Sequence, residues 1–119
     1  MVLDKKGIFA QAVKQTEEVP FGKGKVGVVE LGFNEVNALR ESPLIKDGKG
    51  EFDGYKFIGL LVIFSIRDAK GNRVFEDTDL NDVMNLPRSS YLVLAEAAKK
   101  VNGMADDAVK NSETATPAA

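Results

Sequence analysis

The stretch Tyr55-Lys-Phe-Ile-Gly-Leu-Leu-Val-Ile-Phe-Ser-Ile66 is the most hydrophobic part of the chain and decides its fold. Nearly every position is apolar, so the periodicity does not distinguish a buried helix from a buried strand. The β-branched residues Ile58, Val62 and Ile63 favour a strand, whereas a length of twelve residues favours a helix. The residues alone leave this choice open, but either structure would lie in the core.

A tight turn is predicted directly after this stretch, at Asp68-Ala-Lys-Gly-Asn72, where Gly71 or Asn72 can adopt a positive φ. An extended Arg73-Val-Phe75 should follow. Beyond it, Asp77 or Thr78 is expected to cap a short helix over residues 79–86, whose acidic start suits the helix dipole.

The longest helix is predicted near the C-terminus. Pro87 is tolerated at a first helical position, Ser89 or Ser90 can cap the helix, and Gly103 can end it just after Asn102. Its apolar stripe would consist of Tyr91, Leu94, Ala95, Ala98 and Val101. Residues 104–119 lack aromatic side chains and periodicity, which predicts a disordered tail.

On the N-terminal side, the apolar residues of segment 3–13 fall loosely on one helical face, and Asp4 can cap that short helix. Residues 16–20 are polar and interrupted by proline, and residues 21–31 are expected to form a strand or strand pair entered through a glycine turn. A helix over 33–40 would be stopped by Pro43, and the glycine-rich, charged segment 43–54 predicts a mobile surface loop.

These elements predict one small α+β domain over residues 1–103, mainly helical, with a β-hairpin or strand near its N-terminus and a long C-terminal helix. A chain of 119 residues has no room for a second core. Because it contains no Cys and no His, disulfide scaffolds, thiolate nucleophiles, Ser-His-Asp triads and the common zinc sites are excluded.

Charge and hydropathy narrow the expected partners further. A formal net charge of −2 gives no basic field for a phosphate backbone, so nucleic-acid binding is not expected. Charged residues interrupt the N-terminal segment, which therefore does not resemble a signal peptide. The longest nearly apolar run, 57–66, is half the length of a membrane span, so we expect a soluble protein with no membrane contact.

Two local patterns suggest a ligand but have simpler explanations. Gly22-Lys-Gly-Lys-Val-Gly27 matches G-x-G-x-x-G, yet β-like residues follow it where a dinucleotide site needs a helix, so a hairpin turn is favoured. The acidic residues from Asp68 to Asp82 lack the register of a calcium loop, and turn formation and capping account for them. We therefore expect no metal, no cofactor and no catalytic residue.

The order of several elements resembles the tail assembly chaperones of long-tailed bacteriophages. The resemblance covers residues 17–103. It rests on Glu17-Glu-Val-Pro-Phe-Gly-Lys-Gly-Lys-Val-Gly-Val-Val-Glu-Leu31, on the helix that follows, on Asp68-Ala-Lys-Gly-Asn-Arg-Val-Phe-Glu-Asp-Thr-Asp-Leu80, and on a last helix ending in Val101-Asn-Gly103. It implies that residues 55–66 are a buried helix.

The resemblance also implies a non-catalytic function. Such a protein binds the long tape measure protein in the host cytoplasm and keeps it soluble until tail-tube subunits polymerise, and the tail-tube protein is a second implied partner. It would be absent from the mature virion. A structural virion protein, either a tail-tube subunit or a head–tail connector, is the alternative.

Most large apolar residues should be core, but a chain of this size also has surface for a partner or for a second copy of itself. The candidate contact residues are Phe57, Leu61, Phe64, Leu92 and Leu94. Their apolar side chains suit a partner that presents an amphipathic helix.

Overall fold

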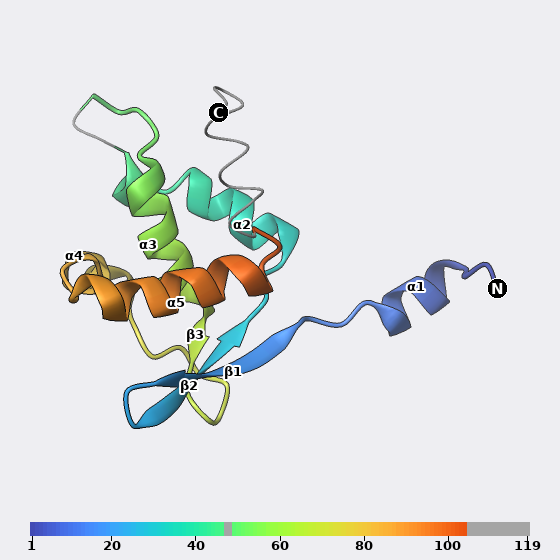
Figure 1. Cartoon of the computed structure of the whole chain (residues 1–119). Coiled ribbons are helices and arrows are strands. Elements are labelled where there is room, and N and C mark those ends of the chain that lie inside the picture. The colour runs from blue at the N-terminus through green and yellow to red at the C-terminus, as the bar shows by residue number, and fades with distance from the viewer. Residues whose placement is uncertain (47–48, 105–119) are drawn as a thin grey trace, which may run out of the picture.

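The computed structural model of the chain describes residues 1–46 and 49–104. Within these residues it has five α-helices, two short 3-10 turns and a three-stranded antiparallel sheet (Figure 1). The predicted α+β class is confirmed, with the hairpin near the N-terminus and a long helix at the C-terminal end. The predicted disordered tail lies outside the described residues except for Met104, which packs against the core instead.

Helix α3 (Gly54–Ser65) forms the centre of the core. The Asp53 carboxylate begins the helix by accepting hydrogen bonds from the backbone N–H groups of Tyr55 and Lys56, at 3.0 and 3.2 Å. Helices α2, α4 and α5 all contact α3, so it is covered on several sides. Burial by these neighbours outweighs the β preference of its branched residues, and the helix implied by the family resemblance is present.

The sheet has the order β1 (Thr16–Phe21), β2 (Gly24–Val29), β3 (Ile66–Arg67). Gly22, with φ of 59°, lies in the turn between β1 and β2, and Val19 pairs with Val26. The expectation that residues 16–20 lie outside the strand is wrong. Pro20 is tolerated because β1 is at the edge of the sheet, where a missing backbone N–H need not break a ladder.

Helix α5 (Arg88–Val101) packs on α3 and on the hairpin. Neither Ser89 nor Ser90 caps it, because the helix begins one residue after Pro87. Its end is as predicted: Gly103 has φ of 76°, its N–H donates to the Lys100 carbonyl, and the Met104 N–H donates to the Lys99 carbonyl. The predicted stripe is buried at Leu94, Ala95, Ala98 and Val101, whereas Tyr91 is half-buried.

The short helix α4 (Leu80–Met84) follows the 3-10 turn η2 (Asp77–Asp79). The predicted cap at Asp77 or Thr78 is wrong, because Glu76 precedes the turn and its backbone N–H donates to the Asp79 carboxylate at 2.7 Å. Helix α4 lies very close to α3 at Gly59. A Cβ atom at Gly59 would be 2.8 Å from Leu80 Cδ1 and 3.0 Å from Met84 Cγ, so the contact needs a glycine.

Helix α2 (Phe33–Arg40) and the 3-10 turn η1 (Pro43–Ile45) cover another side of α3. The predicted helix over 33–40 is confirmed, and Leu39 is its buried residue. Ile45 is completely buried and the next residue, Lys46, forms a β-bridge with Phe52. The segment predicted as a surface loop is therefore anchored at both ends, and its residues 47–48 lie outside the described part.

The predicted turn after α3 is also confirmed. Gly71 has φ of 84°, and the Asp68 carboxylate accepts hydrogen bonds from the backbone N–H groups of Lys70 and Asn72, both at 2.9 Å. After the turn, Arg73 forms an isolated antiparallel β-bridge with Arg67 of β3. The turn therefore returns the chain to the sheet before η2 begins.

Candidate protein-binding surface

Several exposed large apolar side chains follow one another on an N-terminal arm, residues 1–15, which contains helix α1 (Lys5–Gln11). The Asp4 carboxylate caps this helix as predicted, accepting from the Gly7 N–H at 2.8 Å. No residue of α1 is buried, and its Phe9 and Ile8 side chains are 75% and 54% exposed. Figure 1 shows α1 projecting away from the other helices and the sheet. Its apolar face is therefore not buried by the described residues, 1–46 and 49–104.

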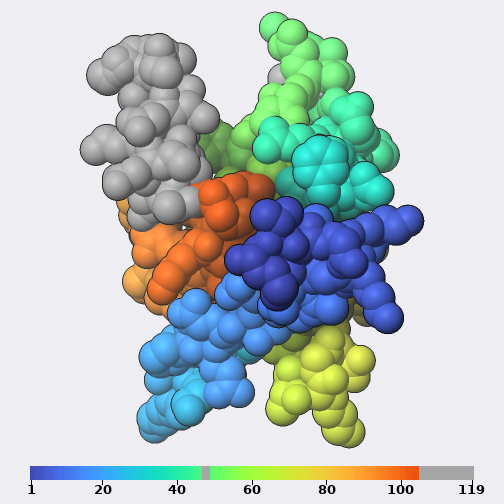
Figure 2. Space-filling model, turned by 90° about the vertical axis from the view of Figure 1, so that its right-hand side faces the viewer, coloured from blue at the N-terminus to red at the C-terminus, as the bar shows by residue number. Residues whose placement is uncertain are grey.

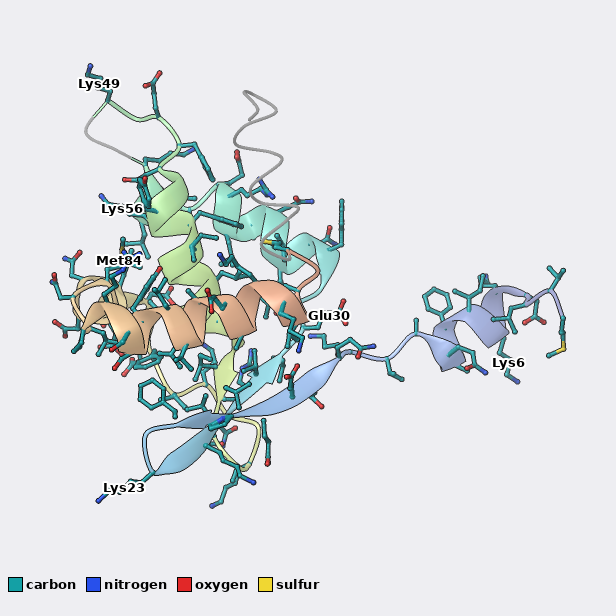
Figure 3. The ribbon with its side chains drawn as sticks, viewed as in Figure 1. Lys6, Lys23, Glu30, Lys49, Lys56 and Met84 are labelled. Carbon is teal, nitrogen blue, oxygen red and sulfur yellow. The ribbon has the colours of Figure 1, made fainter. Side chains whose placement is uncertain are left out.

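The inner end of the arm is fixed to the body of the protein. Gln15 and Glu30 are joined by two hydrogen bonds: the Gln15 N–H donates to the Glu30 carboxylate at 2.9 Å, and the Glu30 N–H donates to the Gln15 carbonyl at 2.8 Å. Lys14 Nζ lies 3.1 Å from the Glu35 carboxylate. The arm thus leaves the body beside the start of α2, and Figure 3 shows Lys6 on its projecting part, away from Glu30.

Glu35 has two partners at this junction. Its carboxylate accepts a 2.6 Å hydrogen bond from the Gly32 N–H, at the start of α2, and it forms the ion pair with Lys14. The hydrogen bond from Gly32, and secondarily the contact with Lys14, lower the pKa of Glu35. The carboxylate is therefore stabilised in its charged form where the arm meets the body.

Three of the five residues predicted to contact a partner lie in the core. Leu61 is completely buried, and Phe57 and Leu94 are 5% and 2% exposed, so none of them can reach a partner in this structure. Leu92 and Phe64 are half-buried. Their prediction as contact residues depends on hydrophobicity, which does not reveal which side of a nearly all-apolar helix faces the interior.

Two of the predicted contact residues are also covered by arginine side chains. The Arg73 guanidinium lies 4.1 Å from the centre of the Phe64 ring, and the Arg40 guanidinium lies 4.9 Å from the centre of the Phe57 ring. Arg73 is held in place by an ion pair with Asp77 at 2.8 Å. The Arg73 guanidinium therefore covers one face of the Phe64 ring.

A shallow hollow lies where α2 meets α3, with a volume of about 260 Å³. We call it the α2–α3 hollow. Apolar side chains of both helices line it together with two carboxylates. Its lining residues are Glu35, Ala38, Leu39, Ser42, Leu60, Phe64 and Asp77.

The acidic residues and the glycine pattern have structural partners. Asp68 holds the turn after β3, Asp77 pairs with Arg73, and Asp79 accepts from Glu76. Among residues 1–46 and 49–104, no three acidic side chains gather as they would around a metal ion. The glycine-rich segment forms a strand, a turn and a second strand. It therefore does not begin a helix whose first backbone N–H groups could bind a phosphate.

Sequence reasoning predicted the N-terminal helix but did not select it as a binding surface. One feature of the sequence could have indicated that this helix is exposed: a polar, proline-containing segment separates its apolar residues from the core residues that follow. No helix in the described part of the chain combines the length and hydrophobicity needed to cross a bilayer.

Comparison of the chain with models of protein families, with curated proteins and with solved structures gives no match. The resemblance to tail assembly chaperones therefore remains a prediction from the residues.

Proposed function

We propose that this protein is a phage tail assembly chaperone that binds the tape measure protein and keeps it soluble until tail-tube subunits polymerise. The observation that supports the proposal most directly is the uncovered apolar face of the N-terminal arm, with Ile8 and Phe9 exposed on α1. The resemblance of the sequence between residues 17 and 103 to tail assembly chaperones supports the choice of this family.

The arm suits this task because α1 has only seven residues. A helix this short is marginal in water by itself and gains stability by placing its apolar side against another apolar surface. A long amphipathic tape measure helix offers many such surfaces before assembly. Each arm would cover one of them.

The small size of each contact also allows the tape measure protein to be released. A single small interface is weak, but many copies bound along one long chain hold it together as a set. Tail-tube subunits can then displace the copies one at a time. On this proposal the protein acts in the host cytoplasm, meets the tail-tube protein as a second partner, makes or breaks no covalent bond, and is absent from the mature virion.

Co-expression with fragments of the tape measure protein tests the proposal. The wild-type protein should increase the soluble fraction of the fragments and be purified with them. Phe9→Asp should abolish both effects, because it places a charge on the apolar face of α1. It should not unfold the body, because no residue of α1 is buried.

Gln11→Asp is the matched control. Gln11 is exposed on α1 two positions after Phe9, and residues two apart in a helix point to different sides. This variant should behave as the wild type. Fragments that stay insoluble with the wild-type protein would contradict the proposal, and stoichiometric protein in purified particles would favour the structural virion protein instead.

A further inference from the structure

The dipeptide Asn102-Gly103, which ends helix α5, is the only Asn-Gly pair in the sequence. An asparagine followed by glycine is chemically labile, because glycine has no side chain to keep its backbone nitrogen from attacking the asparagine side chain. Gly103 is nevertheless needed at this position. Its φ of 76° is the left-handed conformation that ends many helices and that residues with a side chain rarely adopt. The helix end therefore requires the residue that makes Asn102 labile.

The reaction is deamidation of the asparagine side chain. The Gly103 nitrogen loses its proton to solvent and attacks Cγ of Asn102, so that a bond forms between these two atoms and the bond from Cγ to Nδ2 breaks. Nδ2 takes up protons from water and leaves as ammonia. Water then opens the succinimide ring at either carbonyl, which leaves an aspartate or an isoaspartate at position 102. The sum of these steps is the hydrolysis of one amide.

In the folded protein the backbone of this pair is held away from the geometry that the attack needs. Ring closure requires the Gly103 nitrogen to lie beside Cβ of Asn102. With a ψ of 13° at Asn102, and viewed along the Cα–C bond, this nitrogen nearly eclipses the Asn102 backbone nitrogen instead of Cβ. The Gly103 N–H also donates to the Lys100 carbonyl at 3.1 Å, and the Met104 N–H donates to the Lys99 carbonyl. These two hydrogen bonds hold the attacking nitrogen in place.

The side chain of Asn102 is held by separate contacts. Its Oδ1 accepts from the Leu31 N–H, and its Nδ2 donates to the Ser65 hydroxyl and to the Ala98 carbonyl. Leu31 lies between β2 and α2, and Figure 1 shows the end of α5 beside this segment. Turning the amide toward Gly103 therefore breaks hydrogen bonds to two segments that are distant in sequence.

We propose that Asn102 is a deamidation site that is protected only while the last turn of α5 is folded. Gly103 is exposed, and Figure 2 shows the end of α5 at the molecular surface, so solvent reaches the pair. The end of a helix opens locally at a smaller cost in free energy than unfolding of the whole protein. Each opening allows the pair to react, so deamidated protein accumulates with age.

The product does not fit the contacts that the amide made. A carboxylate has no N–H to donate, so the Ala98 carbonyl faces an oxygen where it now accepts a hydrogen bond. In isoaspartate the main chain is also longer by one methylene group, which displaces Gly103 from the Lys100 carbonyl. Deamidation therefore loosens the junction of α5 with α3, and the loss of ammonia makes the change irreversible.

The rate of deamidation at position 102 tests the protection. The purified protein is incubated in mildly alkaline buffer, either folded or in urea, and the peptide that contains residue 102 is analysed by mass spectrometry. The folded protein should react at least about 10-fold more slowly, because the last turn must open first, and a tenfold ratio corresponds to about 1.4 kcal/mol. In urea, Gly103→Ala should slow the reaction, because its methyl group hinders the attacking nitrogen.

Two variants distinguish local opening from unfolding of the whole protein. Ser65→Ala removes one hydrogen bond of the Asn102 amide and should speed the reaction of the folded protein by about 3- to 10-fold. Ile45→Val is the matched control. Ile45 is completely buried and its carbonyl accepts from the Asp53 N–H at the start of α3, so this variant lowers overall stability without touching Asn102. It should react at the wild-type rate.

Asn102→Asp tests the effect of the product on stability. This variant should unfold at a lower urea concentration than the wild type, because it lacks the donor to Ala98. Asn37→Asp adds the same charge at an exposed position of α2 and should unfold as the wild type does.

Three results would overturn the proposal: equal rates of deamidation in the folded and the unfolded protein, equal acceleration by Ser65→Ala and Ile45→Val, or equal stability of Asn102→Asp and Asn37→Asp. No tape measure protein is present in these experiments. Their failure would leave the proposed chaperone function standing, and failure of the co-expression test would leave the deamidation site standing.

Discussion

The side chain of Asn102 is hydrogen-bonded to the hydroxyl of Ser65, with Nδ2 3.1 Å from Oγ, and this contact joins the end of α5 to the end of α3. Asn102 Nδ2 also donates to the Ala98 carbonyl at 2.8 Å, and Oδ1 accepts from the Leu31 N–H at 2.7 Å. One amide therefore connects three segments that are far apart in sequence. Ser65 is completely buried, so Asn102 supplies a partner that water cannot.

Asn102→Ala should therefore destabilise the protein. It leaves the Leu31 N–H and the Ser65 hydroxyl without the amide that now binds them, and an unsatisfied buried polar group costs about 1–3 kcal/mol. The free energy of unfolding, measured with urea, should fall by that amount. Asn37→Ala, on the exposed side of α2, is the control and should change it by less than about 0.5 kcal/mol. Equal effects of the two variants would contradict the role given to Asn102.

The arm and the core should respond differently to the same substitution. Leu94→Ala should lower the free energy of unfolding by about 2–5 kcal/mol, because Leu94 is 2% exposed and its loss leaves a cavity. Leu3→Ala should change it by less than about 0.5 kcal/mol, because Leu3 lies on the exposed arm. Thermal unfolding followed by circular dichroism measures both. A large loss for Leu3→Ala would mean that the arm packs on the body in solution.

The close contact of α3 with α4 predicts that Gly59 resists enlargement. Gly59→Leu should destabilise by about 1–3 kcal/mol, because its side chain would overlap Leu80 and Met84. Gly54→Ala is the control within the same helix. A Cβ atom there would lie 3.8 Å from the Phe52 ring, an ordinary contact, so this variant should be neutral or slightly more stable. Urea unfolding that ranks the two variants in the opposite order would contradict the packing.

The lowered pKa of Glu35 predicts that the free energy of unfolding depends on pH. The Gly32 hydrogen bond and Lys14 lower the pKa of Glu35 in the folded state below its ordinary value of 4.5. The unfolded chain then binds the proton more readily, so this stabilisation is fully present above the ordinary value and is lost as the pH falls through the lower folded-state pKa. The effect should be small because the side chain is 44% exposed.

Melting temperatures of Glu35→Gln and the wild type should therefore converge as the pH is lowered through that acid range and differ at neutral pH. Glu96→Gln, on the exposed side of α5, is the control for the loss of one negative charge. If the melting temperatures of Glu35→Gln and the wild type differ by the same amount from neutral to acid pH, the contribution of Glu35 to the pH dependence of stability would be ruled out.

Local chemistry was enough to predict several elements. The Asp68–Asn72 turn, the helix over 33–40, the Asp4 cap and the Gly103 helix end all depend on residues within a few positions of each other. The cap predictions at Asp77 or Thr78 and at Ser89 or Ser90 failed, because η2 begins directly after Glu76 and α5 begins directly after Pro87.

The amino-acid sequence was enough to predict the α+β class, the turn after α3 and the C-terminal end of the last helix, because these follow from backbone preferences and capping side chains over short distances. Contacts between distant elements decide that residues 54–65 are helical and Ile66 begins β3, that Phe57, Leu61 and Leu94 face inward, and that no residue of α1 is buried by the described part of the chain. The hydrophobicity of a side chain indicates only that its burial away from water is favourable in free energy. Which neighbour covers it depends on elements distant in the chain, and for the N-terminal arm no such neighbour lies within the described residues.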